Sequence, residues 1–259
     1  MHSGQKLQLL RNALGVKIAK SKKMDELNQK LEQLKQRTTI SAFALIGLIV
    51  VALIIFKKFG AYGFIPIALA VLCGIYAAKA QREYKGFYKT TVVPSAIRRC
   101  TFLDDINYDS NAGVDINEVA GSGICARGDN YRSSDLVTAV VCDTEFKLSN
   151  VEITEVHYSG SDNDRSESTI FRGQWVIFDL KKLYCEPKAE LEKLNQKLGK
   201  KIDFKLISQR AHLAIHNNDP FMEGKLGTGK IDALEDEKRI VDTIRAISEF
   251  VEEVSGQKT

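Results

Sequence analysis

The chain has 259 residues and a formal net charge of +4, but the charges are distributed very unevenly. Residues 1–37 carry a net charge of +6 and residues 79–89 carry +3, whereas residues 90–259 carry −7. The acidic part would repel a phosphate backbone, which argues against a nucleic-acid partner. The five cysteines include no C-x-x-C pair, which argues against a disulfide framework and a zinc knuckle. We therefore expect reduced thiols, as in cytosolic domains.

Residues 1–37 are predicted to form an amphipathic helical arm. Ser21 can cap a helix in which apolar residues recur at spacings of three, four and three. These residues are Met24, Leu27, Leu31 and Leu34. A shorter apolar stripe lies upstream and is interrupted by Gly15. The longer stripe covers barely two heptads, so two interpretations remain open: packing against the protein's own domain or the membrane surface, and self-association.

Two uncharged runs, Thr38–Phe56 and Phe59–Ala78, are separated only by Lys57 and Lys58. Helices of these lengths would span roughly 28 Å and roughly 30 Å, close to the thickness of the hydrocarbon core of a bilayer. We predict a transmembrane helical hairpin over residues 38–80, with spans at 38–56 and 60–78, and therefore a lipid bilayer as a partner. Neither span contains a carboxylate, a histidine or an arginine, so the sequence shows no ion path.

Basic residues flank the predicted spans mainly on one side. Six Lys or Arg residues lie from Lys20 to Arg37 and five from Lys79 to Arg98, against two in the loop, Lys57 and Lys58. The positive-inside rule then places both termini in the cytoplasm and the loop outside. The first span begins later than cleaved signal peptides do, so we expect it to remain in the mature protein.

Residues 81–259 are predicted to form one cytoplasmic α+β domain. Stripes of apolar residues at helical spacing predict helices at Arg82–Val93, ended by Pro94, at Pro187–Gly199 and at Ile231–Val254. Runs rich in β-branched and aromatic residues predict strands at Leu136–Cys142, Phe146–Glu155, Thr169–Leu180, Ile202–Ser208 and Ala211–His216. Ser159–Ser168 is expected to be an exposed hairpin loop. Phe171, Trp175 and Phe178 are expected to lie in the core or in a contact between the domain and a helix. The predicted fold class is α+β, with a mostly antiparallel sheet covered by two helices.

Several short motifs are similar to those of an uncharacterised bacterial family of two-span membrane proteins with a cytoplasmic β-rich domain. The residues that carry the resemblance include Gly128 and Asp135, and a Phe-x-Gly strand motif formed by Phe171 and Gly173. The resemblance covers roughly residues 24–250. It implies the architecture and the bacterial inner membrane as the location, and it implies no reaction.

Two segments imitate ligand-binding loops but lack a required residue. Residues 224–230 match the first seven positions of a P-loop, but Ile231 stands where a Ser or Thr must hold magnesium. Residues 107–118 place oxygen ligands at the spacing of a calcium loop, but Ala112 stands where the sharp turn needs Gly. We interpret them as a connector and a surface loop. We predict no cofactor.

Histidines provide the remaining candidates for chemistry. His212 and His216 are four apart on a predicted strand, about 13 Å, which is too far for joint metal coordination, so we predict no metal site. Glu155 and His157 lie on one side of a strand and could transfer protons, with Asp135 as a further carboxylate. Because the sequence ties no nucleophile to His157, we assign no catalytic residue.

The leading hypothesis is a non-enzymatic inner-membrane protein whose cytoplasmic domain binds a protein partner or another copy of itself. The alternative is a membrane-tethered hydrolase or transferase with a site around His157. A third hypothesis is an effector-like protein that inserts into a host membrane.

Overall fold

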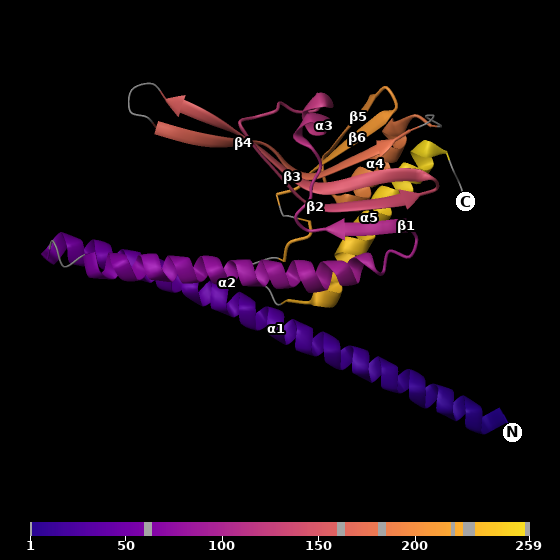
Figure 1. Cartoon of the computed structure of the whole chain (residues 1–259), viewed down its shortest axis with the longest axis horizontal. Helices are drawn as coiled ribbons and strands as arrows, with labels where there is room; N and C mark the ends of the chain where they lie inside the picture. Colours follow the sequence, from indigo (N-terminus) through magenta and orange to yellow (C-terminus); the bar gives the residue numbers. More distant parts are fainter. Residues whose placement is uncertain are drawn as a thin grey trace. The chain divides into compact units, whose positions relative to one another are not determined.

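The computed structural model describes residues 2–59, 64–159, 164–180, 185–218, 221–224 and 231–256 (Figure 1). The chain divides into two compact units. The helical unit consists of residues 1–92 and 224–236, and the sheet unit consists of residues 93–223 and 237–259.

Two long helices make up most of the helical unit. Helix α1 runs from His2 to Phe59 and α2 from Phe64 to Ile97, and both contain a stretch long and apolar enough to cross a membrane. Gly74 of α2 faces Leu45 of α1: a Cβ added to Gly74 would lie 3.9 Å from Leu45, so the small residue lets the two helices approach. Near the loop the rings of Phe56 and Phe64 meet edge to face at 6.1 Å.

Both helices are longer than predicted. Ser21 and Gly15 lie inside α1, so the prediction that Ser21 caps a helix and that Gly15 interrupts one is wrong. The surrounding Lys, Leu, Gln and Ala residues are good helix formers and carry the helix through both positions. Pro94 does not end α2 either. It removes only one helical hydrogen bond in the last turn, where the amide of Arg98 donates to the carbonyl of Pro94 at 3.1 Å.

The sheet unit contains a six-stranded sheet in the order β1-β2-β3-β4-β6-β5, and every neighbouring pair is antiparallel. The strands are β1 (Asp104–Asp109), β2 (Asn130–Val141), β3 (Thr144–Ser159), β4 (Asp164–Asp179), β5 (Ile202–Ile207) and β6 (Arg210–His216). The helices are α3 (Ile116–Gly121), α4 (Pro187–Leu198) and α5 (Ala233–Ser255). The α+β class with helices packed on an antiparallel sheet is thus confirmed.

Helices cover both faces of the sheet. On one face Val119 of α3 packs in a cluster with Phe171 and Trp175, whose rings meet at 5.1 Å. On the other face Phe250 of α5 contacts the rings of Phe178 and Phe204. The prediction that Phe171, Trp175 and Phe178 lie in the core is confirmed, since each is at most 1% exposed. Alternation along β4 explains this, because odd- and even-numbered residues face opposite layers.

The helix ends follow their local sequence. The chain leaves α4 at Gly199 with φ 61°, a left-handed conformation that Gly adopts without cost, as expected. Helix α5 begins at Ala233, two residues later than predicted, because the carboxylate of Asp232 accepts hydrogen bonds from the amides of Leu234 and Glu235 and so caps the helix.

The predictions for the sheet unit need corrections in three places. First, β1 and α3 were not predicted, and β2 begins at Asn130, six residues before the predicted start at Leu136. Second, Ser159–Ser168 is not a loop throughout, since β3 reaches Ser159 and β4 begins at Asp164. The backbone ladder of a hairpin pairs polar residues as readily as apolar ones. Third, the turn before β6 lies at Ser208 and Gln209, and Arg210 belongs to β6, because Ser208 adopts the positive φ of 57°.

Candidate interaction site

The longest strands of the sheet extend beyond their neighbours and form a two-stranded ribbon. The last pair between β2 and β3 is Asn130 with Thr154, and the last pair between β4 and β6 is Gly173 with His216. Residues 155–159 of β3 and 164–168 of β4 pair only with each other. We call these residues the β3–β4 ribbon. Figure 1 shows it projecting from the sheet at the upper left.

The outer edge of β3 is covered at Thr154 and Val156 by the segment before β2. The amide of Asp129 donates to the carbonyl of Thr154 at 2.9 Å, and the Asp129 carboxylate accepts from the amide of Val156 at 2.7 Å. Gly128 makes this approach possible: it has φ 63°, and a Cβ would lie 2.6 Å from the Thr154 carbonyl oxygen. Asp129 thus takes two hydrogen-bonding positions, at Thr154 and Val156, that a further strand would use.

The outer edge of β4 is open along the ribbon. The last backbone bond on this side is donated by the amide of Asn217 to the carbonyl of Arg172 at 2.9 Å. Within the part of the chain that the structure describes, no strand pairs with β4 from Asp164 to Phe171 on this side. Unpaired amide and carbonyl groups of this kind are a template for another strand.

One face of the ribbon carries both charges and an exposed ring. Tyr158 is paired with Arg165 and Val156 with Glu167, so these four side chains share a face. Tyr158 is 73% exposed. Glu167 accepts hydrogen bonds from Thr154 and from Asn130, and these bonds hold the pKa of Glu167 below its usual value. The carboxylate is therefore ionised and oriented.

The ribbon also carries two of the residues singled out from the sequence. The ring Nε2 of His157 lies 2.9 Å from Ser168 Oγ and 3.8 Å from a carboxylate oxygen of Glu155. Both side chains are about half exposed, and they lie on an open surface. The structure thus brings Glu155 and His157 together without enclosing them.

Asp135 lies elsewhere, in a bulge of β2 where its φ is 61°. Its carboxylate is buried and accepts hydrogen bonds from Tyr108 at 2.8 Å, Ser134 at 2.9 Å and Asn150 at 3.1 Å. Burial and the neighbouring carboxylate of Asp135 raise the pKa of Tyr108, which keeps this hydroxyl a donor. His157 follows Asn150 by seven residues on β3, roughly 23 Å of strand, so Asp135 does not join the Glu155–His157 pair.

A polar pocket of about 400 Å³ lies where β6 ends beside β4. It is lined by Thr169, Ile170, Arg172, Lys200, His216, Asn217 and Asn218. Two of its basic groups already have acidic partners: Arg172 pairs with Glu152, and His216 Nε2 lies 2.6 Å from Asp203. Lys200 is the one basic lining residue without an acidic partner among the described residues, so the pocket offers an anion one positive charge at most.

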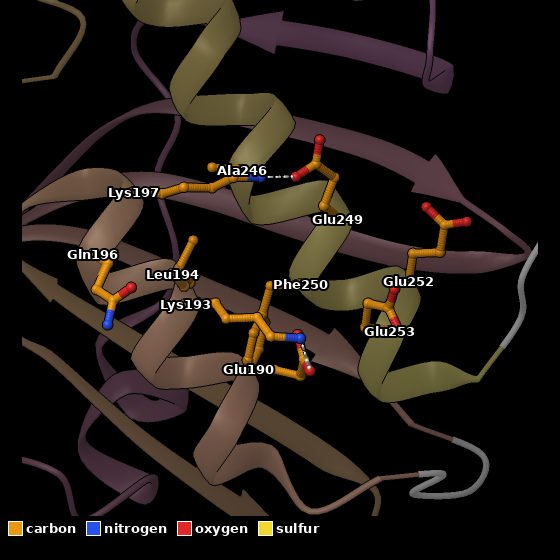
Figure 2. A pocket seen from close by; sticks show the side chains of 10 residues that line it. All are labelled: Glu190, Lys193, Leu194, Gln196, Lys197, Ala246, Glu249, Phe250, Glu252 and Glu253. Atoms are coloured by element: carbon orange, nitrogen blue, oxygen red, sulfur yellow. Dashed lines mark hydrogen bonds and ion pairs between the residues drawn. The ribbon is translucent and has the colours of Figure 1, made fainter.

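A second hollow, of about 740 Å³, lies between α4 and α5 (Figure 2). Its basic residues are also paired, Lys193 with Glu190 and Lys197 with Glu249, as the dashed lines in Figure 2 mark. Glu252 and Glu253 add further negative charge on α5. Among the described residues that line it there is no Ser, Cys or His that could act as a nucleophile or base.

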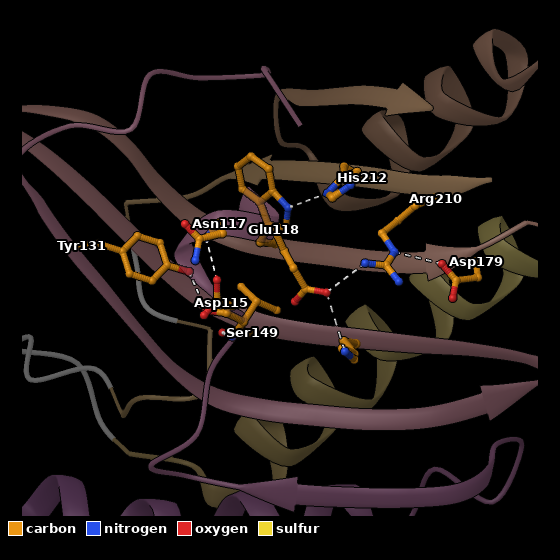
Figure 3. A network of polar contacts seen from close by, with 11 residues as sticks. Asp115, Asn117, Glu118, Tyr131, Ser149, Asp179, Arg210 and His212 are labelled. Carbon is orange, nitrogen blue, oxygen red and sulfur yellow. Dashed lines mark hydrogen bonds and ion pairs between the residues drawn. The ribbon is translucent and has the colours of Figure 1, made fainter. Parts of the chain in front are cut away.

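The residues that imitate a calcium loop are engaged elsewhere. Asp109 accepts from the amides of Asn111 and Ala112, and Asp115 caps α3 through the amide of Asn117 at 2.7 Å. Glu118 pairs with Arg210 at 3.2 Å, and Arg210 also pairs with Asp179 (Figure 3). These oxygens stabilise a turn, a helix start and an ion-pair chain.

The two histidines of β6 have separate environments. The indole NH of Trp175 donates to Nδ1 of buried His212 at 3.4 Å (Figure 3). Burial lowers the pKa of His212, so the ring stays neutral and keeps its lone pair for this bond. His216 pairs with Asp203 instead. Among the described residues, no cluster of three or more His, Cys, Asp or Glu side chains is arranged to hold a metal ion.

Residues 225–230 of the P-loop-like segment lie outside the described residues.

These features define an α+β protein with two helices of membrane-spanning length and a β-ribbon in which no described strand pairs with the outer edge of β4. Comparisons with protein families, with curated proteins and with solved structures find no match for this chain. The resemblance inferred from the motifs at Gly128, Asp135, Phe171 and Gly173 therefore stays a prediction.

Sequence reasoning missed Asp129, Tyr158 and Arg165, which shape the two edges and the face of the ribbon. The signal available was the alternation of charged residues at Arg165 and Glu167, which is typical of a solvated strand. It was obscured by the polar composition of the surrounding segment.

Proposed function

We propose that this protein is anchored in the bacterial inner membrane by the α1–α2 hairpin and presents its α+β sheet unit in the cytoplasm. The sheet unit associates there with a protein partner or with a second copy of this chain. The observation that carries the proposal is the exposure of apolar side chains on the two long helices. The open edge of β4 supports the interaction role.

The exposed apolar side chains are concentrated on one part of the hairpin. Of 19 large hydrophobic side chains exposed in the described part of the chain, 17 lie between Ile40 and Tyr76. The inward positions are instead small, as at Ala52 and Ala70. A soluble protein does not expose a continuous apolar surface of this size to water, whereas lipid chains would cover it. Membrane insertion thus accounts for a surface that water would disfavour.

Replacing Leu72 by aspartate tests the membrane anchor. Leu72 is 63% exposed near the middle of the apolar segment of α2. An aspartate at the centre of a span costs about 3 kcal/mol, so we expect L72D to lose most of the chain from membranes washed with alkaline carbonate. Leu234→Asp is the matched control, because Leu234 is 48% exposed on α5, outside both apolar segments. L234D should remain in the membrane pellet. Equal behaviour of both variants, or a wild-type chain that stays soluble without detergent, would contradict the anchor.

The proposed orientation follows from the basic flanks and has its own test. A membrane-impermeant maleimide added to intact cells should label Lys57→Cys but should label Gln257→Cys only after lysis. The wild-type chain measures the background from the five native cysteines. Labelling of Gln257→Cys from outside would reverse the orientation while leaving membrane anchoring intact.

The arrangement of titratable groups supports an interaction role more than an enzymatic one. Glu155 and His157 lie on an open ribbon, whereas Asp135 is buried among structural hydrogen bonds. A hydrolase or transferase needs its acid, base and nucleophile to converge in a concave site. The open strand edge, in contrast, offers main-chain hydrogen bonds to a partner without any further rearrangement.

A further inference from the structure

We propose that the open edge of β4 in the β3–β4 ribbon pairs, antiparallel, with the same edge of a second copy of this chain, about a two-fold axis at Ser166. The inference rests on the proposed function and specifies the partner within it. The two ribbons would then form one four-stranded ribbon, in the order β3, β4 and then β4 and β3 of the second copy.

The two edges of the ribbon differ, which selects β4. Asp129 occupies the hydrogen-bonding positions of β3 at Thr154 and Val156. No described residue does this for β4 between Asp164 and Phe171. A strand that docks along β3 would meet Asp129 at Thr154 and Val156, whereas the described residues leave β4 clear from Asp164 to Phe171, so the longer ladder forms along β4.

Two-fold symmetry restricts the register of such a pair. A two-fold axis perpendicular to the ribbon makes the two β4 strands antiparallel and keeps each side chain on its own face. The axis must then pass through a residue, with residues equally distant on either side facing each other. This leaves five central positions on the part of β4 that belongs to the ribbon: Asp164, Arg165, Ser166, Glu167 and Ser168.

Charge selects one register from these five. An axis at Asp164, at Arg165 or at Glu167 places that charge opposite its own copy, which is unfavourable. An axis at Ser168 gives Glu167 and Arg165 uncharged partners. An axis at Ser166 places Arg165 of each copy opposite Glu167 of the other, so two ion pairs form. Glu167 is already ionised and oriented by Thr154 and Asn130.

Two further observations favour a second copy as the occupant. Tyr158 lies beside Arg165 on the same face and is 73% exposed, so the pairing would place its ring next to the Arg165–Glu167 ion pair. An anchored protein also meets its own copies in two dimensions, which raises their effective concentration and lets a short ladder suffice.

The test exchanges charges between positions 165 and 167 in the full chain. Two copies with different tags are co-expressed, solubilised in mild detergent and captured through one tag, and the recovery of the second tag is measured. Arg165→Glu in both copies places two carboxylates opposite each other, and Glu167→Arg in both places two guanidinium groups opposite each other. We expect each variant to reduce recovery of the second tag about tenfold. A mixture of one R165E copy and one E167R copy restores an opposite-charge pairing and should recover the second tag well above either variant alone.

Matched controls keep the test specific. Glu155→Arg makes the same charge change as E167R on the other strand of the same ribbon and should leave capture unchanged. Fluorescence of Trp175, the single tryptophan, reports whether each variant keeps the sheet core. Failure of the mixture to recover, or wild-type capture by R165E, would overturn the inference. A different protein could be captured by the wild-type chain, be lost with R165E and not be restored by the mixture. That result would assign the edge of β4 to the different protein and would also overturn the inference. Carbonate extraction measures membrane anchoring separately, so failure of the pairing inference can be distinguished from failure of the proposed membrane anchor.

Discussion

Replacing Gly173 by alanine is expected to destabilise the sheet unit by about 3 kcal/mol or more. Gly173 has φ 157°, and a Cβ at this position would lie 1.9 Å from the carbonyl oxygen of Ile215. This oxygen belongs to the backbone of β6, which is paired on its other side with β5, so it cannot move without disrupting both ladders. The variant must therefore break the β4–β6 register at its end or leave β4 distorted.

Urea unfolding of the full chain in detergent, followed by the fluorescence of Trp175, measures this effect, because Trp175 is fully buried two residues from the substitution. Gly199→Ala is the matched control. Gly199 has φ 61°, and a Cβ added there would meet no atom within 4 Å, so only the left-handed backbone penalty of about 1 kcal/mol remains. Similar midpoints for G173A and G199A would show that the close approach of β4 and β6 does not control stability.

Replacing Asp135 by alanine is expected to cost about 3 kcal/mol of stability. The carboxylate is 1% exposed and accepts hydrogen bonds from Tyr108, Ser134 and Asn150. Its removal leaves buried donors without an acceptor, which costs more than the bonds themselves contribute. The same unfolding measurement applies, because Asp135 and Trp175 belong to one sheet.

Asp143→Ala provides the control for Asp135. Asp143 also has a positive φ, 56°, but lies exposed in the turn between β2 and β3. Both substitutions place alanine in a left-handed conformation, so the difference between them isolates the buried network. Equal unfolding midpoints for D135A and D143A would reject the structural role assigned to Asp135. Asp135 would then again be a candidate catalytic residue.

Part of the candidate site could be predicted from the sequence. Alternation alone places Glu155 and His157 on one side of β3, and the structure brings them together. Alternation could not show that Asp135 lies far from them, because the bulge and positive φ at Asp135 depend on pairing with β3. The role of Asp129 could not be predicted for a similar reason, because Asp129 bonds to the edge of a strand at Thr154, 25 residues later in the chain.

The helix and strand predictions failed where local preference competed with distant pairing. Polar residues from Ser159 to Ser168 favour a loop, yet the ladder between β3 and β4 extends the strands into this segment. Strand β1 was missed because DDINYD has little β propensity, and its pairing with β2 forms it. In contrast, the end of α4 at Gly199 depends only on the residues next to it and was predicted correctly.

The sequence by itself determined the two helices of membrane-spanning length and the distribution of charge around them, because hydropathy and charge add along the chain and need no knowledge of contacts. It also determined the α+β class, since periodicity separates helices from strands. Only the tertiary structure decided that Asp129 covers the edge of β3 at Thr154 and Val156 while no described strand covers the edge of β4 from Asp164 to Phe171. That difference depends on where β2 and β6 end and on how Gly128 lets Asp129 reach β3, and both are contacts between residues distant in sequence.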